Sequence, residues 1–424
     1  MFKVSSLAAL SLFLAGPGLA GPSYVHAGRL LDPETETVLI NQLIKVVGGR
    51  VVSITPWTTA PKDGPVTDWS RYEVLPGLID CHVHLADTDQ SNNVAEPLLH
   101  SNADIAYLGA RHARTTLKAG FTSVHNVGNF RAFADVALRN AINRGDVPGP
   151  RISAVGAYIT TPGGGGEVTG LSTDVGLPAD MRVGVVTSPE DVTRKVDYLF
   201  QNGADSIKLI ATGAVLALGT EVGQQELTEA EMAAAVKAAT AHGGWVTAHA
   251  HGAEGIKSAM RAGVKAIEHA SLIDDEGIAL AKSKGVYLDM DVYNGDFIEE
   301  VGTRDGWPAD YLRKNRETTD LQRDGFRKAV KAGVRMTFGT DAGVYPHGDN
   351  AKQFKYMVRF GMTPMQAIQA ATVNAAALLN WSKDVGALTP GHYADMVAVE
   401  GDPLKDITVL EHVKAVIKGG EVVD

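Results

Sequence analysis

Two histidines separated by one residue are the sharpest chemical signal in the sequence. His82 and His84 close an apolar segment that starts at Pro76. If this segment is a strand, alternate side chains share a face, so both imidazoles can reach one metal ion while Cys81 points away. Taken alone, the pair is compatible with two metal ligands or with two structural histidines.

Three further potential ligands lie at or directly after the ends of later apolar runs: His249, His269 and Asp341. If these runs are parallel strands, their carboxyl ends meet at one face, and in an α/β barrel that face carries the chemistry. Imidazole and carboxylate groups are ordinary ligands of zinc and related ions. The histidines and the carboxylate together therefore predict a metal centre.

Lys208 stands inside another apolar run, residues 206–210. Burying an ammonium group without a counter-charge is costly, so its position needs an explanation. The sequence leaves two explanations open. The lysine pairs with an acid such as Asp341, or it takes part in the metal centre.

Several other residues could contact a substrate. His251 follows His249 on the same predicted face and either contacts a substrate carbonyl or carboxylate or is a solvated loop histidine. Tyr158, Tyr293 and His347 fall in loops after the third, seventh and eighth predicted strands. His125 and Asn126 end the second strand without an assigned role. Six histidines are predicted to be structural or exposed: His26, His100, His112, His242, His392 and His412.

The elements that must position these residues alternate between short apolar runs and helical segments, a pattern of parallel strands joined by crossover helices. Alanine- and lysine-rich stretches such as 229–242 and 324–332 are the predicted helices. Segments 160–186 and 293–311 are long for barrel loops and are expected to shape the substrate site. Eight runs suit a closed (β/α)8 barrel: 74–79, 122–127, 151–155, 206–210, 245–249, 265–269, 286–290 and 335–340.

The two chain ends have short apolar runs without a helical period. We expect residues 21–75 and 386–424 to form one small composite β-sandwich domain beside a barrel of residues 76–385; two unrelated terminal hairpins are the alternative. Residues 1–20 resemble a signal peptide, with Lys3 before an apolar stretch and small residues at 18–20. That stretch is too short for a membrane anchor, so export to the periplasm or the medium is expected.

Bulk composition excludes some partners. The chain has 424 residues and a net charge of −10, which argues against nucleic acid or an anionic membrane surface as a partner. Cys81 is the single cysteine, so no intrachain disulfide can form.

Taken together, these motifs resemble the amidohydrolase superfamily, in its imidazolonepropionase-like and Xaa-Pro dipeptidase-like branch, and are most similar to the ochratoxin A-hydrolysing enzymes. The similarity rests on the segment ending in His82 and His84, Lys208 in Gly-Ala-Asp-Ser-Ile-Lys, the strand ends around His249 and His269, and Gly-Thr-Asp341. It extends to Gly386-x-Leu-x-x-Gly-x-x-Ala-Asp395 near the C-terminus.

The resemblance implies two zinc ions bridged by a carbamylated Lys208 and a hydroxide. His82, His84 and Asp341 would hold the more buried ion, and His249 and His269 the more exposed one. The hydroxide would attack an amide carbonyl, Asp341 would move the proton, and His251 would assist. A homo-oligomer is also implied.

The implied substrate is an amide next to a free carboxylate: an N-acyl amino acid, a dipeptide, or ochratoxin A, which would yield phenylalanine. Two alternatives stay open. One is a cyclic amide or lactone hydrolysed at the same site, and the other is an exported binding protein without catalysis.

Overall fold

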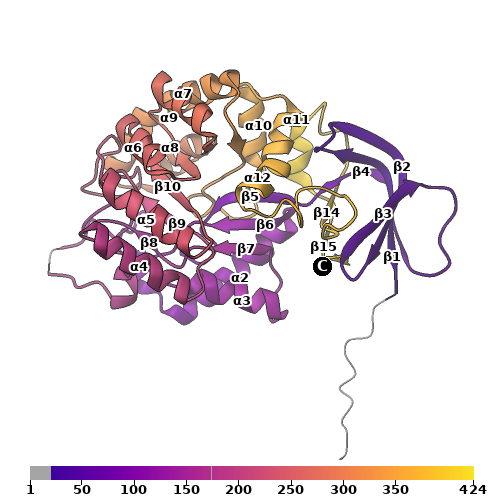
Figure 1. Ribbon diagram of the computed structural model, residues 1–424, viewed down its shortest axis with the longest axis horizontal. Helices are drawn as coiled ribbons and strands as arrows, with labels where there is room; N and C mark the ends of the chain where they lie inside the picture. Colours follow the sequence, from indigo (N-terminus) through magenta and orange to yellow (C-terminus); the bar gives the residue numbers. More distant parts are fainter. Residues whose placement is uncertain (1–20, 173) are drawn as a thin grey trace, which may run out of the picture.

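A computed structural model describes residues 21–172 and 174–424, which form a barrel with a separate β-sheet at one end (Figure 1). The predicted signal peptide, residues 1–20, lies outside the described residues. Within the described ranges, no helix is both long and apolar enough to span a membrane.

The barrel is built from parallel strands, as predicted. Its first and last strands meet where the Cys81 amide donates to the Phe338 carbonyl at 2.8 Å, and the Asp341 amide donates to His82 at 2.8 Å. The strands in chain order are β5 (Leu78–Val83), β6 (Phe121–Asn126), β7 (Arg151–Ala154), β8 (Tyr158–Ile159), β9 (Ile207–Ile210), β10 (Val246–Ala250), β11 (Ala266–His269), β12 (Tyr287–Asp289) and β13 (Met336–Thr337).

Two strand assignments from the sequence need correction. The run 74–79 crosses a boundary, because β4 (Val66–Pro76) belongs to the terminal sheet and the barrel strand β5 starts only at Leu78. Gly77 allows this change of sheet, since a Cβ there would lie 2.1 Å from Thr122 Oγ1. The third strand is divided into β7 and β8 around Gly156, whose φ of +80° breaks the extended backbone.

Helices cover the outside of the barrel (Figure 1). Some start at a side-chain cap, such as Ser101 for α2 and Thr228 for α5, and others end at a left-handed glycine, such as Gly263 for α6 and Gly285 for α7. Their bounds are α1 (Glu96–Leu99), α2 (Asn102–Lys118), α3 (Ala134–Arg144), α4 (Pro189–Gln201), α5 (Glu229–Ala241), α6 (Ala253–Ala262), α7 (Asp275–Lys284), α8 (Asn294–Asp305), α9 (Ala309–Ala332), α10 (Lys352–Arg359), α11 (Pro364–Ala370) and α12 (Val373–Leu378).

The segment 293–311 is not the long loop that the sequence predicts, because α8 fills most of it and α9 begins within it. Polar composition hides α9 from a search for apolar periodicity. Its surface carries ion pairs one turn apart, such as Arg313 with Glu317 at 3.0 Å, which stabilise a helix without an apolar stripe. By contrast, the described residues of the segment 160–186 are largely irregular, apart from a short 3₁₀ turn, Ala179–Arg182.

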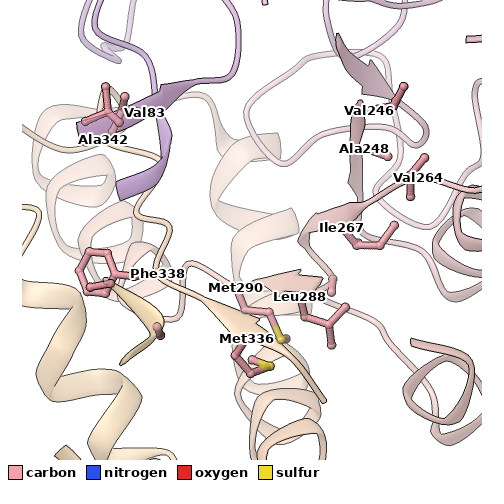
Figure 2. Close-up of a cluster of buried hydrophobic side chains, with 14 of the residues drawn as sticks. Val83, Val246, Ala248, Val264, Ile267, Leu288, Met290, Met336, Phe338 and Ala342 are labelled. Carbon is pink, nitrogen blue, oxygen red and sulfur yellow. The ribbon is translucent and has the colours of Figure 1, made fainter. Parts of the chain in front are cut away.

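Apolar side chains between the strands and the helices form the main core. Figure 2 shows Val246, Ile267, Leu288 and Phe338, which come from successive barrel strands or their ends and are buried. Cys81 is also buried and free. This packing fixes the strand ends from which the polar residues of the site project.

Both chain ends contribute to one seven-stranded sheet, in the order β16-β15-β14-β4-β1-β2-β3. The N-terminal strand β4 pairs with the C-terminal strand β14 in antiparallel fashion. The ends therefore share a sheet instead of forming separate hairpins, although the predicted domain boundaries remain a prediction. The other strands are β1 (Ser23–Asp32), β2 (Thr37–Val47), β3 (Arg50–Pro56), β14 (Met396–Val399), β15 (Ala415–Lys418) and β16 (Glu421–Val422).

Candidate metal centre

The histidine pair and the predicted carboxylate meet where the barrel closes. His82 lies in β5, His84 follows it, and Asp341 follows β13. Asp341 Oδ1 lies 3.3 Å from His82 Nε2 and 3.0 Å from His84 Nε2. One carboxylate oxygen thus faces both imidazoles, an arrangement in which the three groups can share a cation.

Three more histidines gather beside this group from β10 and β11. The ring of His249 lies 4.6 Å from the rings of both His251 and His269, centroid to centroid. Potential ligand atoms of these three residues lie within 4.8 Å of one another, and the same holds for His82, His269 and Asp341. His269 belongs to both groups, so the site consists of two adjoining sets of ligands, and His251 lies inside it.

Hydrogen bonds at Nδ1 orient four of these rings. Glu268 Oε2 lies 2.9 Å from Nδ1 of His82, and Asp291 Oδ1 lies 3.1 Å from Nδ1 of His269. The same nitrogen contacts Ser271 Oγ in His251 and the Gly128 carbonyl in His84. Each ring therefore directs Nε2 into the site, as in metal centres where a second group holds the ligating histidine.

His249 has the opposite orientation. Its Nε2 faces the Gly213 carbonyl at 3.4 Å, which leaves Nδ1 as the nitrogen available to a ligand. Four rings therefore present Nε2 to the site, and His249 presents Nδ1.

The backbone at the site is held in an uncommon conformation. His269 and Asp341 have φ values of +66° and +57°, a region that side-chain-bearing residues rarely adopt. Such strain persists where surrounding structure imposes it and is concentrated at functional sites. Asn294 supports Asp341, because its amide donates to Oδ2 at 3.1 Å.

Lys208 projects from β9 into the same site and is 1% exposed. No ion pair within 4 Å joins its ammonium to a carboxylate of the described residues, so the alternative of a direct pairing with Asp341 is not formed; Glu268 and Asp341 act on Lys208 only through longer-range charge. Burial lowers the pKa of Lys208 and favours the neutral amine. A buried lysine without a partner, surrounded by free imidazole nitrogens and a carboxylate, fits a bridging position between metal ions.

Sequence reasoning missed the residues that support the ligands. Glu268 and Asp291 hold histidine rings, and Gln322 donates from α9 to Asp291 Oδ1 at 2.8 Å. The position of Glu268 could have indicated its role, because a carboxylate inside an apolar strand needs a partner. Gln322 had none, since only the folded chain brings α9 over the barrel.

The predicted substrate residues divide into two groups. Tyr158 and His251 line the open cavity above the site, and Tyr158 Oη lies 3.0 Å from His84 Nδ1. Tyr293 and His347 are not among the described residues that line it. Tyr293 packs against Tyr345 and Tyr356, so its predicted substrate contact has no support from the geometry.

His125 and Asn126 have structural contacts. His125 Nε2 lies 2.8 Å from Ser206 Oγ, and Asn126 Oδ1 accepts the Leu85 amide at 2.7 Å. Both are fully buried.

Acidic side chains dominate the charge of the cavity: Asp87, Asp89, Glu96 and Glu167 stand around Asp291 and Asp341. Among the described lining residues, Lys208 is the only lysine or arginine. These carboxylates disfavour negative charge on a bound molecule wherever no cation compensates it.

Comparison with known proteins agrees with this geometry. Residues 74–423 match the Amidohydrolase family. The chain is 30% identical over 439 residues to the ochratoxinase of Aspergillus niger, covering 97% of this chain and 88% of that protein. A solved Xaa-Pro dipeptidase with bound methionine in the active site matches with a TM-score of 0.90 and 37% identity, covering 95% and 99% of the two chains. A prolidase complexed with N-methylphosphonate-L-proline matches with a TM-score of 0.88 and 28% identity, over 95% and 99%.

Proposed function

Because the chain belongs to the amidohydrolase family and is a hydrolase acting on C–N bonds, we propose that it cleaves an amide next to a free carboxylate. N-acyl amino acids, dipeptides and ochratoxin A are the candidate substrates. The last two are suggested by the names of the dipeptidase and ochratoxinase relatives.

The observation that carries the proposal is the unpartnered Lys208 amid five histidines and Asp341. We propose that its neutral amine adds to CO2. As the Nζ–carbon bond forms, one C=O π bond of CO2 breaks onto oxygen, Nζ releases a proton to water, and the product is a carbamate anion. This reaction turns the amine into an anionic group that suits two divalent ions.

In the proposed centre, His82, His84 and Asp341 would hold one zinc ion and His249 and His269 the other, with the carbamate of Lys208 as a shared ligand. Bound zinc supplies an activated water and polarises the carbonyl of the substrate. Asp341 remains beside the reacting groups, with Oδ2 oriented by Asn294. We expect this carboxylate to take the proton of the water and to pass it to the leaving amine.

Uncharged polar side chains line the cavity where the carboxylate of the substrate would bind: Tyr158, His251 and Ser271. Asn294 also lines it, but its amide already donates to Asp291 and Asp341. The acidic side chains that line the cavity oppose a second negative charge on the substrate, beyond its free carboxylate. We therefore expect amino acids with neutral or basic side chains to be released faster than aspartate or glutamate.

A panel of matched substrates tests the substrate class. We expect release of the free amino acid from N-acyl amino acids, dipeptides or ochratoxin A, with a rate at least tenfold lower when the same carboxylate is amidated. Equal rates on the acid and its amide would remove the free carboxylate from the proposal. Hydrolysis of lactones or cyclic amides alone would assign the site to the alternative chemistry.

A further inference from the structure

A second group of potential metal ligands lies beside the cavity, on residues without a place in the catalytic centre. His112 comes from α2, His347 from the segment after β13, and Asp89 from the segment after β5. Their potential ligand atoms lie within 4.8 Å of one another. The two imidazole rings face each other at 4.3 Å, and His112 Nε2 lies 3.6 Å from Asp89 Oδ1.

His347 lacks the contacts that a buried imidazole needs. The residue is 8% exposed, yet neither of its ring nitrogens has a hydrogen-bond partner among the described residues. Buried polar atoms are almost always satisfied, so an orphaned one calls for a partner such as a water molecule or an ion. The orphaned nitrogens lie next to the other two members of the cluster.

The contacts of His112 direct its ring nitrogen Nε2 toward Asp89. Its Nδ1 lies 3.0 Å from the Leu85 carbonyl, which can only accept, so Nδ1 carries the proton. The other ring nitrogen, Nε2, faces Asp89. The guanidinium of Arg111 also contacts this nitrogen, at 3.1 Å, which is consistent with an acceptor there.

We propose that Asp89, His112 and His347 bind a further divalent ion of the zinc class, separate from the catalytic pair. Two imidazoles and one carboxylate suit zinc and leave a fourth position for water. A tetrahedral zinc ion separates its ligand atoms by roughly 3.3 Å, so the stacked rings of His112 and His347 would rotate to direct their nitrogens at the ion. The ion would join α2 to the segments that follow β5 and β13, which also carry His84 and Asp341.

Arg111 is the natural competitor of this ion, because its guanidinium occupies the approach to His112 Nε2 and lies 3.7 Å from Asp89. Its side chain is 62% exposed and can turn into solvent when an ion binds. Removing its charge should therefore tighten the site, whereas removing a ligand should abolish it.

Metal counting on the holoenzyme tests the site. After incubation with zinc chloride and removal of unbound ions, we expect wild type to hold one more zinc per chain than His347→Gln. We expect His242→Gln, which alters an exposed histidine paired with Asp197, to keep the wild-type count. Arg111→Gln should lower the zinc concentration at half-saturation severalfold. Zinc should also raise the Tm of wild type further than that of His347→Gln.

If His347→Gln does not fold, Asp89→Asn replaces a half-exposed side chain and should lose the same ion. An equal zinc count in wild type and both ligand variants would overturn the proposal. The test compares counts between variants, so it stands whether or not the catalytic pair and its activity are as proposed.

Discussion

At the scale of single residues, the site depends on carboxylates that hold the imidazole rings in position. His82 is oriented by Glu268, His269 by Asp291, and both carboxylates are buried. The convergence of the histidines and Asp341 could be predicted from the sequence, because their types and positions at strand ends suffice, whereas their binding of a metal stays a prediction. Glu268 and Asp291 could not be assigned, since their roles depend on contacts between strands.

Asp341→Asn tests the proton carrier. The amide cannot take a proton from water, so we expect kcat to fall by about 10² to 10⁴-fold. Circular dichroism and metal analysis should show a folded protein and report any loss of zinc. A rate within threefold of wild type would rule out the proposed role.

Glu268→Gln tests the orienting carboxylate. Loss of the charge that holds His82 should lower zinc affinity by about 10 to 100-fold, measured by competition with a chelator. Glu276→Gln is the control, because this carboxylate is 77% exposed and pairs with Lys257 at the surface. Equal affinities in the two variants would contradict the role of Glu268.

At the scale of elements, the strand ends and their connections set the positions of the ligands. The barrel could be predicted from eight apolar runs separated by helical segments. The boundary at Gly77 and the helix α8 could not, because both depend on what the chain packs against. Gly343, in the connection after β13, shows the same dependence: a Cβ there would lie 2.9 Å from His84 Cβ.

Gly343→Ala and Gly361→Ala form a matched pair, since both glycines have a φ of +123° but Gly361 has no atom within 4 Å of a Cβ. Both changes should lower Tm, because alanine rarely adopts this φ. Only Gly343→Ala should displace His84 and lower kcat/KM, by at least about tenfold. A similar loss of kcat/KM in both variants would mean that contact with His84 is unimportant.

At the scale of the whole molecule, polar contacts join the terminal sheet to the barrel. Lys418 in β15 donates to the Gly149 carbonyl at 2.6 Å, and Asp395 lies 3.3 Å from Arg151 at the start of β7. Burial and the neighbouring Arg151 lower the pKa of Lys418 to about 8. The similarity of the two chain ends predicts their pairing, but not which charges are buried between the sheet and the barrel.

Lys418→Met tests this junction through pH. Because the pKa of Lys418 is lower in the folded chain, the unfolded chain holds more protons between about pH 8 and 10.5. Wild type should therefore gain stability relative to Lys418→Met as pH rises from 7 to 10, by about 2 kcal/mol after allowing for partial exposure. Denaturant unfolding at the two pH values measures the difference. A constant difference would mean that Lys418 is not perturbed.

The most direct test of the central claim is reconstitution of metal-free enzyme with zinc, with and without bicarbonate, followed by release of phenylalanine from ochratoxin A and from N-acyl and dipeptide substrates. We predict that activity returns with zinc, requires CO2 or bicarbonate, and appears together with a carbamate signal from Lys208 in ¹³C NMR. Full activity of the metal-free protein, or zinc binding without any amide hydrolysis, would contradict the account.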